Sequence, residues 1–119
     1  MDGKKRRQKI LIVDDSEMNR SILVDMLGEE YETIEVENGL MAVNELQKRA
    51  AEISLVLLDI VMPLMDGLEV LEVMNRRRWI ETVPVIMISA ETTSDRISQA
   101  LEMGVTDFIS RPFDAKIVQ

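Results

Sequence analysis

The chain has 119 residues, enough for one domain with a single hydrophobic core and too few for two. Hydrophobic residues make up 46% of it, which is typical of a globular chain. It has no cysteine and no histidine, so disulfides, thiolate zinc sites and a histidine base are excluded. No apolar run approaches the roughly 20 residues of a membrane span, and the first residues lack the apolar segment of a signal peptide. We therefore expect a cytoplasmic protein without a membrane partner.

The basic residues are concentrated at the start of the chain. The formal net charge is −8, yet five of the 14 basic residues fall within the first nine positions. From Ile10 onward the sequence has 9 basic and 21 acidic residues, a net charge of −12. This negative net charge argues against a nucleic-acid-binding face on the folded domain. We interpret residues 1–8 as a solvated basic tail and residues 9–119 as the folded domain.

The first two predicted elements are a buried strand and a helix. Residues Ile10–Val13 are all apolar, which predicts a strand buried on both faces, and Asp14 and Asp15 follow it directly. Ser16 is a good N-cap residue for the next helix, which we expect to end at Gly28. Its predicted inward residues, at helical spacing, are Met18, Ile22, Leu23, Met26 and Leu27.

The next strand and helix are more polar. In Tyr31–Val36 apolar residues alternate with glutamates, as in a half-exposed strand at the edge of a sheet. Asn38 and Gly39 form a turn into a helix that spans about residues 40–50. Its predicted inward residues are Leu40, Val43 and Leu46.

A second apolar run without alternation predicts a central strand. It spans residues 54–59 and ends in a single carboxylate, Asp59. Pro63 stops any regular continuation, and a turn at 65–67 leads into a helix that reaches about Arg78. The predicted inward residues of this helix are Leu68, Leu71 and either Val70 or Met74.

Two further strands complete the pattern. Residues Val83–Ile88 predict a fourth strand that ends at Ser89, with a helix to about Met103 after it. The predicted inward residues of that helix are Ile97, Ala100 and Leu101. Asp107–Ser110 predicts a fifth strand, followed by Arg111 and Pro112. The last helix, which starts near Asp114 and stops at Gln119, is expected to be short or truncated.

Strand and helix therefore alternate five times, which predicts an α/β fold. Strands joined through helices are parallel, and right-handed crossovers place helices on both faces of the sheet. A flavodoxin-like doubly wound (βα)5 sheet with the order 2-1-3-4-5 puts the alternating strand at an edge. The switch point then lies between strands one and three, whose ends carry Asp14, Asp15 and Asp59.

Three carboxylates at one edge of a sheet favour a metal site. They repel one another strongly unless a cation lies among them. Only oxygen ligands are on offer, which favours a hard cation such as Mg²⁺, with Mn²⁺ or Ca²⁺ as alternatives. An aspartate in such a site can act as a nucleophile and form an aspartyl phosphate. A Ser89 hydroxyl and an Arg111 guanidinium at neighbouring strand ends could stabilise two of the phosphoryl oxygens.

At these residues the sequence resembles the receiver domain of two-component response regulators. The resemblance extends from about Lys9 through nearly the whole chain. The segments that carry it are Leu11–Asp15, Leu57–Pro63 with Met65–Gly67, Ile88–Ala90, Gly104–Phe108 and Arg111–Phe113.

The resemblance implies a phosphoacceptor domain and not an enzyme with turnover. Asp59 would accept a phosphoryl group from a histidine kinase or a phosphotransfer protein. Asp14, Asp15, Asp59 and the backbone carbonyl of Val61 would bind Mg²⁺.

The resemblance also implies a switch. Ser89 would move toward the phosphoryl group, and Phe108 would turn inward with it. The fourth helix, the fifth strand and the last helix would then act on an output domain or a partner protein. The resemblance leaves open whether the domain forms a homodimer.

Two departures from the family pattern keep other interpretations open. The family has a lysine before this proline, whereas this chain has Arg111, so the alternative is a pseudo-receiver that docks a partner without phosphorylation. The family also ends in a longer helix. We therefore expect either a fragment of a longer regulator or a domain whose bare sheet face is covered by a partner.

Two other classes are less favoured. A flavodoxin-like cofactor binder would need a phosphate-cradling loop after the first strand, where Asp14–Glu17 would repel phosphate in the absence of a metal. A hydrolase that uses Asp59 in true turnover would lack an acid–base partner such as histidine.

Overall fold

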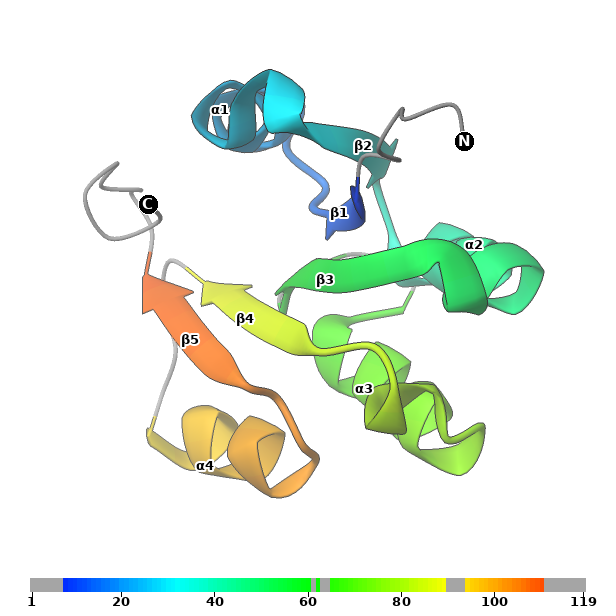
Figure 1. The fold of residues 1–119 in the computed structure, drawn as a ribbon. Coiled ribbons are helices and arrows are strands. Elements are labelled where there is room, and N and C mark those ends of the chain that lie inside the picture. Colours follow the sequence, from blue (N-terminus) through cyan, green and yellow to red (C-terminus); the bar gives the residue numbers. More distant parts are fainter. Residues whose placement is uncertain (1–7, 61, 63–64, 90–93, 111–119) are drawn as a thin grey trace.

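Strands and helices alternate along the chain in the computed structural model (Figure 1). The structure describes residues 8–60, 62, 65–89 and 94–110, except for the side chains of Ser89, Ser94, Arg96 and Ser110. The strands are β1 (Gln8–Val13), β2 (Tyr31–Val36), β3 (Ile53–Asp59), β4 (Val85–Ser89) and β5 (Asp107–Ser110). The α-helices are α1 (Glu17–Leu27), α2 (Gly39–Arg49), α3 (Gly67–Arg76) and α4 (Ser94–Glu102). Short 3-10 helices precede three strands: η1 (Gly28–Glu30), η2 (Ala50–Glu52) and η3 (Trp79–Glu81).

The strands form one parallel sheet with the order β2-β1-β3-β4-β5. This confirms the predicted doubly wound α/β fold and the position of the alternating strand, β2, at an edge. The sheet order reverses between β1 and β3, and the carboxyl ends of these two strands meet there.

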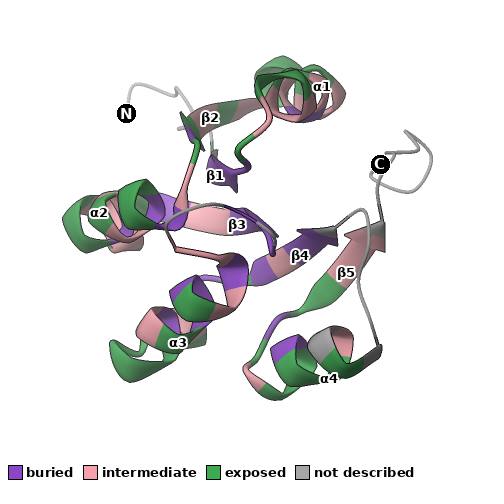
Figure 2. Ribbon diagram, turned by 180° about the vertical axis from the view of Figure 1, so that it is seen from behind, coloured by how far each residue is buried: buried purple, intermediate pink, exposed green. Residues whose placement is uncertain are grey.

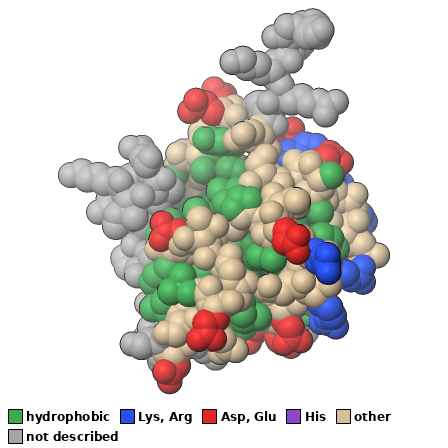
Figure 3. Space-filling view, turned by 60° about the horizontal axis from the view of Figure 1, so that its bottom comes forward, with side chains coloured by type: hydrophobic (Ala, Val, Ile, Leu, Met, Phe, Trp, Pro, Cys, Tyr) green, Lys and Arg blue, Asp and Glu red, His purple; other side chains and the backbone are tan. Residues whose placement is uncertain are grey.

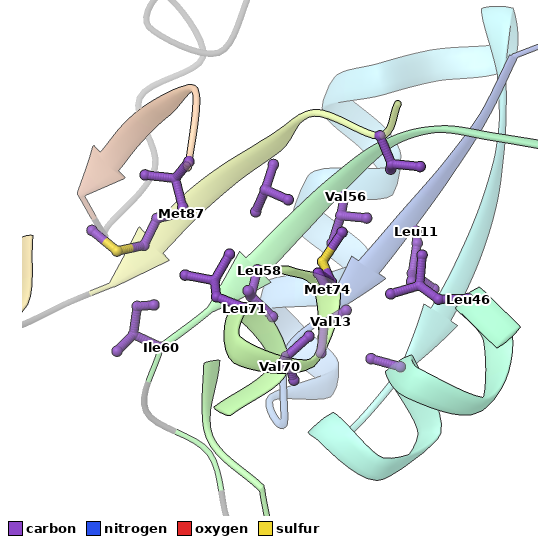
Figure 4. Close-up of a cluster of buried hydrophobic side chains, with 14 of the residues drawn as sticks. Leu11, Val13, Leu46, Val56, Leu58, Ile60, Val70, Leu71, Met74 and Met87 are labelled. Atoms are coloured by element: carbon purple, nitrogen blue, oxygen red, sulfur yellow. The ribbon is translucent and has the colours of Figure 1, made fainter. Parts of the chain in front are cut away.

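The larger core lies between the sheet and helices α2, α3 and α4. Alternate residues of β1 and β3 point into it, because successive strand residues face opposite sides of a sheet. Figure 4 shows Leu11, Val13, Val56 and Leu58 of these strands together with Met74 of α3. Every one of these five side chains is fully buried. Figure 2 shows the same layering, with buried residues on the strands and on the inner sides of the helices.

The opposite face of the sheet is covered by α1, and its core is smaller. Leu23 of α1 packs against Ile10, Ile12, Leu57 and Ile88, which belong to three different strands. On the same face two further strand residues, Leu55 of β3 and Ile86 of β4, are only partly buried. In Figure 1, α1 lies on one side of the sheet, and α3 and α4 lie on the other.

Three predictions about inward-facing residues were wrong. Met18 is 73% exposed, Leu40 is 50% exposed and Leu101 is 52% exposed. Met18 and Leu40 are the second residues of their helices, and Leu101 is the last but one. Successive residues point about 100° apart around a helix, and in α4 the inward position belongs to Ala100, the neighbour of Leu101. The apolar pattern predicted the helices correctly, but it did not predict which residues at their ends face the core.

Three element boundaries differ from the prediction by two residues. β1 begins at Gln8 and not at Ile10. β4 begins at Val85 and not at Val83, because Pro84 has no N–H to contribute to a strand ladder. The Pro84 carbonyl still accepts a hydrogen bond from the Val56 amide at 3.0 Å. α3 ends at Arg76, two residues early, and Arg78 has a left-handed backbone with φ of 64°.

A side-chain bridge joins α3 to the end of α4. The Asn75 side-chain amide donates to the Leu71 carbonyl at 2.9 Å and to the Met103 carbonyl at 2.7 Å. Leu71 lies one turn back in the same helix, whereas Met103 directly follows α4. Asn75 therefore holds the last turn of α3 against the segment that connects α4 to β5.

The surface carries charges of both signs. In Figure 3, acidic side chains are spread over the visible face, whereas Lys and Arg side chains gather along one side of it. None of the described helices is long and apolar enough to cross a bilayer.

Candidate functional site

The register of the sheet places Asp14 beside Asp59. Val13 of β1 pairs with Leu58 of β3, so the residues that follow them come level at the carboxyl edge. Both aspartates are fully buried, whereas Asp15 is exposed. The prediction that these strand ends bring three carboxylates together is confirmed.

The three carboxylates are close enough to share one cation. One oxygen of Asp14, one of Asp15 and one of Asp59 all lie within 4.8 Å of one another. Two like unit charges about 4 Å apart repel by roughly 4 kcal/mol at an effective dielectric constant of about 20. A divalent cation offsets this repulsion, and an all-oxygen donor set is the kind that Mg²⁺ or Mn²⁺ takes. The residues therefore fit a hard divalent cation, with Asp15 on its solvent side.

Asp14 is held in place by hydrogen bonds on three sides. Its backbone N–H donates to the Val36 carbonyl of β2 at 3.1 Å. One of its carboxylate oxygens accepts from the Ser16 backbone N–H at 2.9 Å. Its carbonyl accepts from the Arg20 guanidinium at 2.7 Å. The carboxylate therefore projects from a peptide segment that is fixed before and after it.

The segment after Asp59 returns closely to the end of β3, where Gly67 begins α3. The Gly67 amide donates to the Ile60 carbonyl at 2.9 Å. A Cβ at Gly67 would lie 2.5 Å from the Asp59 carbonyl oxygen and 2.7 Å from the Ile60 Cα. Only glycine allows the helix to approach the end of β3 at Asp59 so closely.

Two further residues fix the turn before α3. Asp66 and Glu69 form a reciprocal capping box, in which each side chain accepts from the other's backbone N–H at 3.0–3.1 Å. On the other side, a Cβ at Gly39 would collide with the carbonyl and side chain of Met65. The turn is therefore packed between the first residues of α2 and α3.

The remaining predicted site residues lie on β4 and β5 or outside the described residues. Ser89 ends β4, one position beyond Ile88, the register partner of Asp59, so its backbone lies at the same sheet edge. Phe108 of β5 is partly buried and packs against the larger core. Val61 and Arg111 lie outside the described residues.

A family model described as the response regulator receiver domain matches residues 10–119. The chain belongs to this family. Its parallel sheet and its cluster of three aspartates are those of a receiver domain, and the resemblance inferred from the sequence is confirmed.

The relatives of this receiver domain differ in the share of their length that it covers. It is 40% identical over 112 residues to a protein-glutamate methylesterase/protein-glutamine glutaminase of Pyrococcus horikoshii, covering 90% of this chain and 29% of that protein. It is 32% identical over 104 residues to the two-component response regulator ORR5 of Oryza sativa subsp. japonica, covering 87% of this chain and 77% of that one. The receiver thus spans less than a third of the methylesterase's length.

A solved structure shares both fold and sequence. A chain in the crystal structure of the CheX–CheY–BeF3–Mg²⁺ complex from Borrelia burgdorferi is 33% identical, with a TM-score of 0.83. The match covers 92% of this receiver and 82% of that chain.

Two residues that support the carboxylates, Arg20 and Glu35, belong to no site motif of the sequence. Glu35 is one of the glutamates that alternate with apolar residues in β2, and Arg20 is a single basic residue of α1. The signal for Arg20 is compositional, because it is the only basic residue between Lys9 and Lys48. Arg20 is an isolated cation in an acidic stretch, six residues after the candidate ligand Asp14, and this isolation is the sequence signal that indicates it.

Proposed function

We propose that this receiver accepts a phosphoryl group on Asp59 from a histidine kinase or a phosphotransfer protein, with Mg²⁺ bound by Asp14, Asp15 and Asp59. The observation that supports this most strongly is the triple carboxylate cluster at the switch point, with Asp59 fully buried at the end of the central strand. The Val61 carbonyl is proposed as a further metal ligand. A cytoplasmic location is part of this proposal.

The transfer requires one bond to form and one to break. A carboxylate oxygen of Asp59 attacks phosphorus, and the phosphorus–nitrogen bond of the donor phosphohistidine breaks, leaving its electron pair on the imidazole nitrogen. Asp14, Asp15 and Asp59 would hold the cation, which would supply positive charge against the negative phosphoryl oxygens. The Ser89 hydroxyl and the Arg111 guanidinium are proposed to bind the other phosphoryl oxygens.

The test is the intact mass after incubation with acetyl phosphate and Mg²⁺. We expect one added phosphoryl group on the wild type and none on Asp59→Asn. Asp25→Asn, an exposed aspartate on α1, is the matched control and should be labelled like the wild type. Full labelling of Asp59→Asn would show that another residue is the acceptor.

We propose that phosphorylation repacks the face formed by α4, β5 and the residues that follow β5. Phe108 is partly buried on β5, and Ser89 ends the adjacent strand at the phosphoryl edge. BeF3⁻ with Mg²⁺ should change amide exchange between residues 94 and 110 more than in α2. Equal exchange with and without BeF3⁻ would make Phe108 a core residue only.

A pseudo-receiver remains the second candidate, and Arg111 is the feature that favours it. Lysine presents a compact ammonium, whereas arginine is a larger planar fork that must find partners for more donors. We expect the wild type to phosphorylate more slowly than Arg111→Lys and to couple less strongly to Ser89 and Phe108. Equal rates for wild type, Arg111→Lys and Arg111→Ala would show that the side chain is idle. Complete inertness that Arg111→Lys relieves would favour the docking module.

A further inference from the structure

Arg20 links three parts of the structure around the acidic cluster. Its Nη1 donates to the Asp14 carbonyl at 2.7 Å, and its Nε lies 3.2 Å from a carboxylate oxygen of Glu35. Arg20 belongs to α1, Asp14 follows β1, and Glu35 lies on β2. The Arg20 side chain is only 14% exposed, although Glu35 at the sheet edge is 42% exposed.

The bond to Asp14 controls the geometry of two ligands at once. The Asp14 carbonyl belongs to the peptide plane that joins Asp14 to Asp15, and both residues contribute an oxygen to the cluster. Fixing that carbonyl fixes the rotation of the plane, and with it the direction in which Asp15 projects. The Ser16 amide bonds to the Asp14 carboxylate and the Val36 carbonyl bonds to the Asp14 N–H, whereas Arg20 bonds to the carbonyl of this plane.

Arginine suits this position because its donors diverge in one rigid plane. One nitrogen reaches the Asp14 carbonyl while another reaches Glu35, so a single side chain spans an acceptor just after β1 and an acceptor on β2. The ion pair with Glu35 holds the guanidinium at the sheet edge. A lysine has one nitrogen at the end of a flexible stem and cannot reproduce this fork.

We propose that Arg20, anchored by Glu35, is a positioning residue that holds the Asp14–Asp15 peptide in the orientation needed to bind the divalent cation. This inference rests on the proposed metal-dependent function and deepens it. Partners that orient metal ligands are worth about 10-fold to 100-fold in metal affinity.

The two possible roles of Arg20, as a positive charge and as a positioning residue, predict opposite changes in cation affinity when Arg20 is removed. If Arg20 acted only as a positive charge near the site, its removal would strengthen the binding of a cation. If it positions the ligands, its removal weakens that binding even though the local charge becomes more favourable. The sign of the change therefore separates the two roles.

The experiment is calorimetric titration of the full chain with Mg²⁺. We expect Arg20→Ala to bind about 10-fold more weakly than the wild type, with Arg20→Lys in between and Glu35→Gln also weakened. Arg49→Ala is the matched control, because Arg49 on α2 has the same 3.2 Å contact from its Nε to a glutamate, Glu45. It should bind Mg²⁺ like the wild type. Arg20→Ala binding equal to or tighter than wild type would overturn the inference.

A second measurement needs no metal. Amide exchange at Asp15 and Ser16 in the metal-free protein should be faster in Arg20→Ala than in the wild type, and unchanged in Arg49→Ala. Equal exchange in both variants would count against the positioning role. If Arg20→Ala does not fold, Arg20→Lys and Glu35→Gln carry both measurements, and wild-type values in both of them would overturn it.

The two proposals fail differently. If the wild type binds no Mg²⁺, the result contradicts both the proposed function and this inference. If the wild type and Arg20→Ala bind Mg²⁺ equally tightly, the result contradicts only the role of Arg20.

Discussion

The last apolar residues of the two central strands and the aspartates that follow them are neighbours in the sequence, but their burial has opposite energetic consequences. Val13 and Leu58 are fully buried among aliphatic side chains. The next residues, Asp14 and Asp59, are equally buried but carry carboxylates. Burial of the first pair stabilises the fold, whereas burial of the second costs free energy unless other groups compensate for it. Within these strands the kind of group that is buried, and not the degree of burial, separates the core from the site.

The largest effect is expected at Leu58, the last apolar residue of β3. Leu58→Ala should lower the free energy of unfolding by about 2–5 kcal/mol, because it leaves a cavity in the larger core. Leu55→Ala, on the same strand but partly buried on the α1 face, should lower it much less. Urea unfolding of both variants measures the difference. Similar losses for the two would mean that the two faces contribute equally to stability.

A smaller effect should couple core and site at Gly67. Gly67→Ala places a Cβ against the Asp59 carbonyl and should lower stability by about 1–3 kcal/mol, with weaker Mg²⁺ binding as well. Gly28→Ala is the control, because its φ of 72° strains any side chain although no atom lies within 4 Å of the added Cβ. It should lower stability without changing Mg²⁺ affinity. Equal Mg²⁺ affinity in the two variants would contradict the role of Gly67.

The acidic ends of the strands should respond to metal while the core does not. Mg²⁺ at ten times its Kd stabilises the folded state by roughly 1.4 kcal/mol if it binds only that state. Asp14→Ala and Asp15→Ala should remove this stabilisation, and Asp25→Ala on α1 should keep it. Thermal unfolding with and without Mg²⁺ checks all three. A wild-type Tm that ignores millimolar Mg²⁺ would refute the metal site.

The smallest effect concerns the cap of α1. The Ser16 hydroxyl accepts from the Asn19 amide at 3.2 Å, so Ser16→Ala should lower stability by about 1 kcal/mol. Mg²⁺ affinity should not change, because Ser16 holds Asp14 through its backbone N–H. Asn38→Ala removes the corresponding cap of α2 and should behave alike. A Ser16→Ala variant that loses Mg²⁺ affinity would show that the hydroxyl also supports the site.

Much of the fold could be predicted from the sequence because its signals are local. Unbroken apolar runs at Ile10–Val13 and before Asp59 identified the central strands, and the alternation in Tyr31–Val36 identified the edge. The carboxylate cluster followed from topology, since parallel strands end at one edge. The phase of helix ends did not follow, because Met18 and Leu40 satisfy the apolar period and are nevertheless exposed.

The supporting residues of the site were not predictable in the same way. The Arg20 side chain donates to the backbone carbonyl of Asp14. Every residue type has a backbone carbonyl, so the residue types do not indicate this contact. Glu35 pairs with Arg20 only because β2 lies beside β1, which is a tertiary fact. The sequence predicts ligands from their chemistry, whereas the groups that orient those ligands depend on packing.

The Asn75 bridge limits how α4 can move. It fixes the Met103 end of that helix to α3, so any rigid displacement of α4 that keeps the bond is a rotation about this pivot and not a translation along the sheet. The helix has nine residues, a lever of about 13 Å at 1.5 Å per residue. The displacement then grows along α4 and is greatest at Ser94, the end that follows the carboxyl edge of β4. A small tilt at the fixed end therefore produces a larger displacement at the Ser94 end of the helix.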